Sequence, residues 1–169
     1  DNITGGMLAT QHLIQLGRKR IAFLGGLSDD LTVQHRYQGY EKALKEAGRR
    51  AFSKLVAYGD YSYISGLGAM QRLLKQSPDL DAVFVNSDLM AIAAIKVILE
   101  SGRRVPDDVA VVGYDDVSIA LYNNLPLTTI RQNVPLAGQL LAQNLIRYIK
   151  TGEVTHVTTS VELVIRNSA

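Results

Sequence analysis

The chain has 169 residues, of which 47% are hydrophobic and 20% are charged, and its formal net charge is +2. This composition is typical of one globular domain with a buried core, and it excludes intrinsic disorder. The absence of cysteine excludes disulfides, thiolate metal sites and a cysteine nucleophile, and the small net charge argues against nucleic-acid binding by this stretch itself. Apolar runs are far shorter than the roughly 20 residues of a membrane span, and the opening residues do not resemble a signal peptide. A first residue other than Met is consistent with a piece of a longer protein.

The first two thirds of the sequence alternate between amphipathic and wholly apolar segments. Helices are predicted over residues 4–16, 34–47, 62–75 and 89–100, and strands over residues 21–24, 55–58, 82–85 and 109–112. Short apolar strands that alternate with helices predict an α/β fold, with a doubly wound, mainly parallel sheet and helices on both faces.

Beyond Gly113 the alternation changes. The sequence predicts a loop with one short helical turn over 114–126, then a strand over 128–130. A helix with one strongly apolar face follows over 134–150, and an alternating pattern predicts a last strand over 157–165.

Three helix ends share a glycine followed by cations. They are Gly17-Arg18-Lys19-Arg20, Gly48-Arg49-Arg50 and Gly102-Arg103-Arg104. Glycine supplies the left-handed conformation that ends a helix, and the cations complement the negative end of its dipole. Solvated helix ends are therefore the favoured interpretation, and a nucleic-acid patch is the alternative.

Polar side chains follow each of the four predicted strands. Thr32 and Arg36 come after the first strand, Tyr61 after the second, Ser87 after the third and Asp115 after the fourth. Because the carboxyl ends of parallel strands meet at one edge of the sheet, we expect these side chains on a single rim. A guanidinium fork, an acceptor-only carboxylate and a flat phenol ring suit a small polar ligand.

Simpler structural roles compete with that interpretation. Asp60 and Asp88 are well placed to cap the helices that follow them. Arg36 could lie on a helix surface beside Glu41, and Tyr61 could simply pack in its loop.

The sequence gives little support to an enzyme. It contains no dinucleotide-binding G-x-G-x-x-G after the first strand, no P-loop and no nucleophile elbow. The three histidines are scattered, without the spacing of metal ligands, so neither a metal site nor a cofactor is predicted. The leading enzyme hypothesis is phosphoryl transfer with Mg²⁺ held by Asp115 and Asp116.

Together these segments resemble the effector-binding domain of the lac/galactose repressor family, which has the fold of periplasmic sugar-binding proteins (type I). The resemblance runs almost end to end. It is carried by Gly6–Gly17, Arg20–Gly26, the R-x-x-G-Y-x-x-A-L pattern of residues 36–44, Ser87-Asp88-Leu89-Met90-Ala91, the stretch from Arg104 to Asp116, Pro126–Ile130 and the closing Glu162–Arg166.

The resemblance implies roles for individual residues. Arg36 and Asp115 correspond to a pair that grips the effector, Tyr61 to an aromatic residue that stacks on it, and Ser87 and Thr32 to lesser contacts. The implied effector is a sugar or a sugar derivative, with a purine as the other possibility. Some family members carry a basic contact at the position of Asp30, so this acid leaves the chemistry of the effector open.

The resemblance also implies a division of the chain between two lobes. Residues 1–127 and 153–169 correspond to the second lobe, and residues 128–152 to a crossover strand and helix of the first lobe. The helix over 134–150 would then lack its natural sheet, and we expect its leucine face to be covered by something else.

The implied protein is a cytoplasmic transcription regulator that does not bind membranes. It dimerises through the helix over 89–101 and the loop over 118–125, where Ile92, Ile95, Ile119, Leu121 and Leu125 supply apolar area. Burial in the core is the alternative that explains the isoleucines at least as well. It binds operator DNA through an N-terminal helix-turn-helix that this sequence does not contain. A periplasmic sugar-binding protein of a transporter is the alternative with the same fold.

Overall fold

The computed structural model describes every residue of the chain except 123. The helices are α1 (Asn2–Gln15), α2 (Leu31–Glu46), α3 (Tyr63–Gln76), α4 (Asp88–Glu100), α5 (Ser118–Tyr122) and α6 (Val134–Thr151), and η1 (Ser53–Leu55) is a single 3-10 turn. The strands are β1 (Ile21–Gly25), β2 (Val56–Tyr58), β3 (Ala82–Val85), β4 (Ala110–Asp115), β5 (Thr128–Gln132) and β6 (Val161–Val164).

The predicted elements are all present, and most bounds agree within three residues. The last strand is the exception, because it covers Val161–Val164 rather than 157–165. Its predicted first residues precede the stretch that pairs with β5, and the antiparallel register begins at Val161, opposite Gln132.

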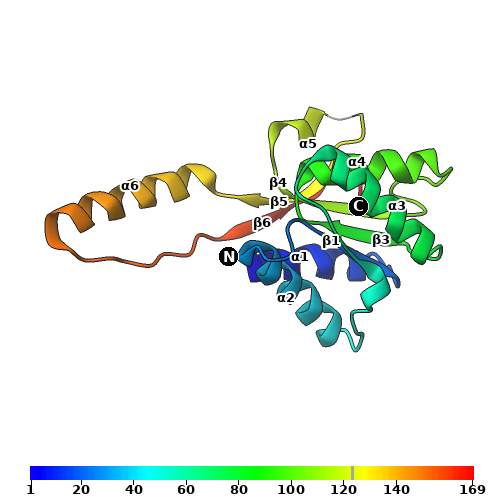
Figure 1. Cartoon of the computed structure of the whole chain (residues 1–169), viewed down its shortest axis with the longest axis horizontal. Coiled ribbons are helices and arrows are strands. Elements are labelled where there is room, and N and C mark those ends of the chain that lie inside the picture. Colours follow the sequence, from blue (N-terminus) through cyan, green and yellow to red (C-terminus); the bar gives the residue numbers. More distant parts are fainter. Residues whose placement is uncertain (123) are drawn as a thin grey trace.

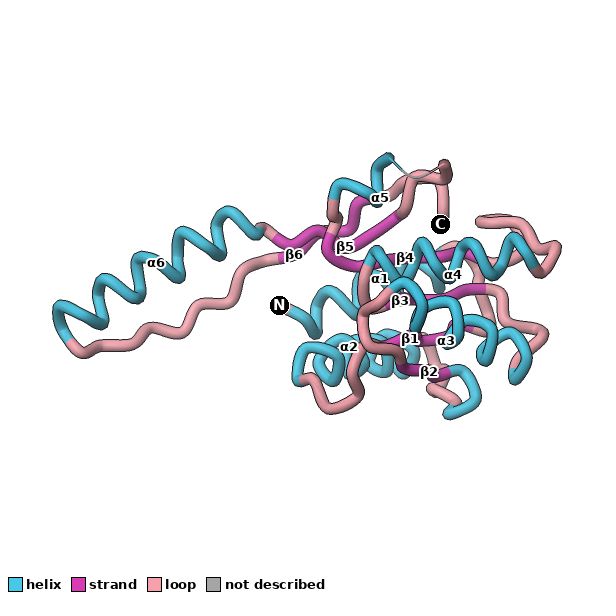
Figure 2. Tube along the Cα trace, turned by 45° about the horizontal axis from the view of Figure 1, so that its top comes forward, coloured by secondary structure: helices cyan, strands magenta, loops and turns pink. Residues whose placement is uncertain are grey.

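One sheet organises the chain, in the order β2-β1-β3-β4-β5-β6. The pairs from β2 through β5 are parallel, and only β6 runs antiparallel, along β5 (Figure 2). The mainly parallel α/β prediction is therefore confirmed. Parallel pairing brings the carboxyl ends of β1, β3 and β4 to the same edge, from which the candidate site is built.

Helices cover both faces of this sheet, with α1 and α2 on one side and α3 and α4 on the other (Figure 1). In β1 the side chains of Ile21 and Phe23 enter the core beneath α1 and α2, while Ala22 and Leu24 enter the opposite core. Because successive side chains point to opposite faces and both faces are covered, a central strand has no polar side. This explains the wholly apolar runs.

Helices α1 and α2 approach closely at two glycines, Gly6 and Gly39. A Cβ atom added at Gly39 would lie 2.7 Å from the backbone nitrogen of Met7, closer than real Cβ contacts allow. The close approach brings the start of α1 over α2, so that Asn2 reaches the side chain of Arg36.

Helix α6 projects away from the body of the molecule together with the returning segment 152–160 (Figure 1). None of its residues is buried, and Leu141 and Ile149 are 72% and 75% exposed. Its polar contacts are with the returning segment, where Asn144 and Arg147 both bond to Thr155. The apolar face of α6 is thus exposed in this chain, so the expectation that something else covers it stays a prediction, as does the division into lobes. Within the described part of the chain, no helix combines the length and apolarity needed to cross a bilayer.

Candidate functional site

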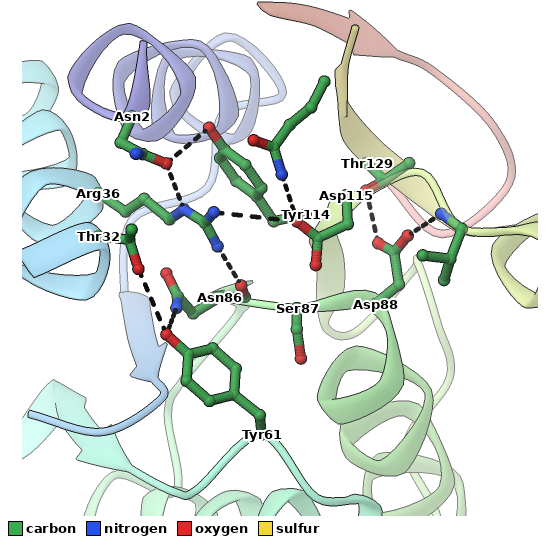
Figure 3. A network of polar contacts seen from close by, with 12 residues as sticks. Asn2, Thr32, Arg36, Tyr61, Asn86, Ser87, Asp88, Tyr114, Asp115 and Thr129 are labelled. Atoms are coloured by element: carbon green, nitrogen blue, oxygen red, sulfur yellow. Dashed lines mark hydrogen bonds and ion pairs between the residues drawn. The ribbon is translucent and has the colours of Figure 1, made fainter. Parts of the chain in front are cut away.

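The polar side chains predicted to share a rim do come together beyond the carboxyl ends of the central strands (Figure 3). Arg36 reaches in from α2, Tyr61 from the loop before α3, Ser87 from the start of α4 and Asp115 from the end of β4. Nη2 of Arg36 lies 3.9 Å from Oδ1 of Asp115. The topology therefore joins residues that are nearly 80 positions apart.

The guanidinium of Arg36 is the most firmly held group of this rim. The residue is only 6% exposed. Its Nε donates to Oδ1 of Asn2 at 2.9 Å, and its Nη1 donates to the backbone oxygen of Asn86 at 2.7 Å. The guanidinium carbon lies 3.6 Å from the centre of the Tyr114 ring. These contacts exclude the alternative of an exposed arginine beside Glu41, and they fix the direction of the remaining N–H groups.

Asp115 stands at the end of β4 with its side chain 32% exposed. Nε2 of Gln132 donates to its Oδ1 at 2.7 Å. Burial raises the pKa of Asp115 above its ordinary value, while the charge of Arg36 and the bond from Gln132 act in the other direction. The carboxylate is thus only partly compensated, which suits an acceptor for ligand hydroxyls.

The ring of Tyr61 packs over Gly26, where an added Cβ atom would lie 2.6 Å from its Cε1. Its hydroxyl donates to Oδ2 of Asp30 at 2.7 Å. Asp30 caps α2 by accepting from the backbone nitrogen of Thr32, and Oγ1 of Thr32 also donates to Oδ1 of Asp30 at 2.7 Å. The hydrogen bonds from Tyr61 and then Thr32 lower the pKa of Asp30. Tyr61 therefore packs within its loop, and one edge of its ring also lies at the rim.

The two acids predicted to cap helices do not do so. The caps are the serines beside them: Ser62 begins α3 and Ser87 begins α4, each accepting from a backbone N–H within the first turn. Asp60 instead accepts from the backbone nitrogen of Ser62 at 2.9 Å. Both predictions were wrong because a serine one or two residues away occupies the cap position. Ser87, predicted as an effector contact, is 7% exposed and already serves the helix.

Asp88 is turned inward and is 1% exposed. It accepts from Oγ1 of Thr129 at 2.5 Å and from the backbone nitrogen of Val117 at 2.9 Å. Burial raises the pKa of Asp88 to about 7, although these two bonds act against the shift. This carboxyl joins α4, the loop after β4 and β5 at one point.

Asp116, one of the two acids of the magnesium hypothesis, is paired with two arginines. Both carboxylate oxygens of Asp116 are taken, by Nε of Arg131 and by Nη2 of Arg166, each at 2.5 Å. Burial acts to raise the pKa of Asp116, but the hydrogen bonds from Arg166 and Arg131 hold it below its ordinary value. The described residues contain no cluster of three acids or histidines that could hold a metal ion.

Backbone strain is concentrated on this rim. In the described part of the chain, the non-glycine residues with positive φ are Tyr61 at 69°, Asp115 at 109° and Asp116 at 54°. Such conformations cost of order 1–3 kcal/mol each and persist where surrounding structure enforces them, often at ligand sites. Two of these three residues are among the predicted site residues.

Several residues that build the rim were not predicted as site residues. Asn86 and Tyr114 hold Arg36, and Asn2 and Gln132 hold the members of the pair. Asn86 and Tyr114 do stand at strand ends, so their position was a usable signal. Asn2 and Gln132 come from elements whose approach the sequence does not reveal. Oδ1 of Asn86 is buried and has no hydrogen-bond partner among the residues described.

Comparison with known proteins gives consistent matches over the whole chain. Residues 10–169 match the family described as periplasmic binding protein-like domain. An HTH-type transcriptional regulator CelR of Thermobifida fusca is 50% identical over 92% of this chain and 45% of its own length. An HTH-type transcriptional repressor PurR of Mannheimia succiniciproducens is 38% identical over 99% of this chain and 51% of its own.

Among solved structures, a transcriptional regulator CelR–cellobiose complex superimposes with a TM-score of 0.96 at 45% identity. The match covers 100% of this chain and 52% of that one. The chain therefore spans about half the length of the relatives it matches.

Proposed function

Since the chain belongs to the periplasmic binding protein-like domain family, among its lac/galactose repressor-type members, we propose that it is the effector-binding and dimerisation part of a DNA-binding transcription regulator. The relatives are HTH-type transcriptional regulators, which disfavours the transporter-linked periplasmic protein. The same relatives support a protein without catalytic activity, acting in the cytoplasm where operator DNA lies.

The observation that carries the proposal is the buried guanidinium of Arg36, whose ion pair with Asp115 is long. It is fixed by neutral acceptors and an aromatic ring, and its carboxylate neighbour Asp115 stands 3.9 Å away, beyond hydrogen-bond distance. A buried charge costs stability unless it is paired and hydrogen-bonded. A polar ligand that accepts from Arg36 and donates to Asp115 would supply both missing interactions.

The chemistry of the rim favours a sugar. A pair of neighbouring hydroxyls can accept from the guanidinium and donate to the carboxylate at once, and Tyr61 lies at the edge of the same space. The cellobiose complex of a 45% identical regulator makes a β-linked glucose disaccharide the first candidate. Purine bases, which carry both ring N–H donors and acceptors, are the second class to test.

Effector binding would act by closing two lobes of the full-length protein. Residues 1–127 and 153–169 form the second lobe, and residues 128–152 pass to the first, whose sheet would cover the apolar face of α6. That face is exposed over most of its length, including Leu141 and Ile149. The ligand shifts the DNA-binding state only through its different affinity for the open and closed forms.

The dimer surface would lie on α4 and the loop 118–125, of which residue 123 is outside the described part. Ile119 and Leu121 are 46% and 51% exposed, which suits an interface. Ile95 is only 3% exposed and belongs to the core, so core burial, and not the dimer surface, accounts for this residue. Ile92 and Leu125 are partly buried against the same core.

The proposal is tested with the full-length protein on its operator DNA. We expect cellobiose or a related sugar to raise the melting temperature and to change DNA affinity, measured by fluorescence anisotropy. The substitution Arg36→Ala should abolish both effects of the sugar. The control Arg104→Ala, which changes an exposed arginine paired with Asp107 and Asp108, should leave both effects intact. Equal sugar responses of the Arg36→Ala variant and the unchanged protein would refute the proposal.

A further inference from the structure

The cations that follow the helix ends are not equivalent in the folded chain. Gly17, Gly48 and Gly102 all adopt left-handed conformations with φ between 71° and 84°, as the helix-end interpretation predicts. All three turns precede the amino ends of strands, at the edge of the sheet opposite the rim of Arg36 and Asp115. What differs among the three turns is how their cations are used.

The third turn is fully occupied with structural contacts. Arg103 donates to the backbone oxygens of Leu80 and Pro78, and Arg104 pairs with Asp107 and Asp108. Arg18 of the first turn is similar, because it donates to the backbone oxygens of residues 106 and 107. These arginines hold neighbouring loops together, although Nε of Arg18 is buried without a hydrogen-bond partner among the described residues, and none of the three lines the cavity described next.

The remaining cations of the first two turns surround one cavity of about 610 Å³. It is lined by Lys19, Arg20, Ile21, Leu44, Gly48, Arg49, Arg50, Phe52 and Leu55. Four of these residues are cations and none is acidic. The volume lies within the range of about 300–1,000 Å³ that is usual for small-molecule sites.

Two observations indicate unused capacity for an anion there. Nη2 of Arg20 is buried without a hydrogen-bond partner in the part of the chain that the structure describes. Nε of Arg20 is 3.0 Å from a carboxylate oxygen of Asp79, which lies outside the cavity lining. This ion pair partly neutralises the charge of Arg20. The side chains of Lys19 and Arg50 are exposed and form no ion pair within the described part of the chain, although the backbone N–H groups of Lys19 and Arg20 donate to the carboxylate of Asp81. The residues that line the cavity therefore include four cations and no acid.

The negative end of α2 does not cancel this excess of cations. The carbonyl oxygens of residues 43–45 already accept from the backbone nitrogens of Ala47, Gly48 and Arg49. Nη1 of Arg49 donates to the backbone oxygen of Arg18, and this hydrogen bond holds the two turns together. An anion in the cavity would therefore meet cationic side chains rather than open carbonyl groups.

The cavity also has an apolar, aromatic side. The guanidinium carbon of Arg50 lies 4.9 Å over the ring of Phe52, which is 38% exposed, and Ile21, Leu44 and Leu55 form the floor. Guanidinium planes and phenyl rings both accept a stacked flat ring. Arginine and lysine together are suited to a phosphate group.

We propose that this cavity binds a mononucleotide, with its phosphate held by Lys19, Arg20 and Arg50 and its base stacked against Arg50 and Phe52. The site is separate from the effector rim and lies at the other edge of the sheet, so the protein could respond to a second small molecule. The proposal does not depend on the identity of the effector.

The test is calorimetric titration of adenosine 5′-monophosphate into the full-length protein. We expect saturable binding of one nucleotide per chain. Adenosine, which lacks the phosphate, should bind about tenfold more weakly. The double substitution Lys19→Ala and Arg50→Ala should weaken the nucleotide by about tenfold or more. Both side chains are exposed, so the fold should be retained, which an unchanged melting temperature without ligand would verify.

Matched controls locate the site. Lys75→Ala removes one exposed positive charge outside the cavity and should leave nucleotide affinity unchanged. Phe52→Ala should weaken the nucleotide but not inorganic phosphate, because it removes only the stacking surface. The proposal is overturned if the nucleotide does not bind, if the double variant binds it normally, or if its binding is lost on Arg36→Ala and so belongs to the rim.

Discussion

Replacing Asp88 with Asn should make the protein more stable at neutral pH and should flatten its pH dependence. The carboxyl is 1% exposed and its pKa is raised to about 7 from an ordinary value of 3.8. The folded state therefore holds a proton that the unfolded state releases, so stability is lost as pH rises from about 4 to 7. Each unit of pKa difference corresponds to about 1.4 kcal/mol, which gives about 4 kcal/mol over the full window.

The asparagine can retain both contacts. Its oxygen can accept from the backbone nitrogen of Val117, and its amide can donate to Oγ1 of Thr129, whose hydroxyl can rotate. Urea unfolding of the full-length protein at pH 5 and pH 8 provides the measurement. The difference in free energy of unfolding, variant minus unchanged protein, should be about 3 kcal/mol more favourable to the variant at pH 8 than at pH 5.

The control is Asp29→Asn, which neutralises an exposed carboxylate and should change stability little at either pH. If Asp88→Asn shifts stability equally at pH 5 and pH 8, or lowers it at pH 8, the buried-proton reasoning is refuted.

Three further substitutions test the packing. Gly39→Ala forces a Cβ atom to within 2.7 Å of a backbone atom of α1, so urea unfolding should show a loss of about 1–3 kcal/mol. Gly68→Ala in α3 places its Cβ 3.5 Å from a side chain of Arg72, an ordinary contact, and the gain in helix propensity should stabilise the protein by about 0.5–1 kcal/mol. Tyr40→Phe removes the hydrogen bond to the backbone oxygen of Ile21, which is 2.9 Å long, and should lower the free energy of unfolding by about 1 kcal/mol. Equal effects of the two glycine substitutions, or an unchanged Tyr40→Phe protein, would contradict the packing described.

The fold was largely predictable because its signals are local. A buried strand with both faces covered must be apolar throughout, and β1 and β3 show this in their sequences. Parallel pairing then places Arg36 and Asp115 at one edge without any knowledge of their contacts.

What the sequence could not supply was the direction and neighbours of individual side chains. Asp88 follows a strand and precedes a helix, as a cap would, yet Ser87 takes the cap and Asp88 turns inward. Asn2 approaches Arg36 only because α1 and α2 meet at glycines, and a close approach of two backbones leaves no periodic pattern. Tertiary contacts of this kind decide which polar residues of the rim remain available to a ligand.

The central claim is that Arg36 and Asp115 together hold the effector, and a crystal structure of the full-length protein with its sugar tests it most directly. We predict sugar oxygens within about 3 Å of the guanidinium of Arg36 and of the carboxylate of Asp115. A sugar bound with neither residue in contact would contradict the account.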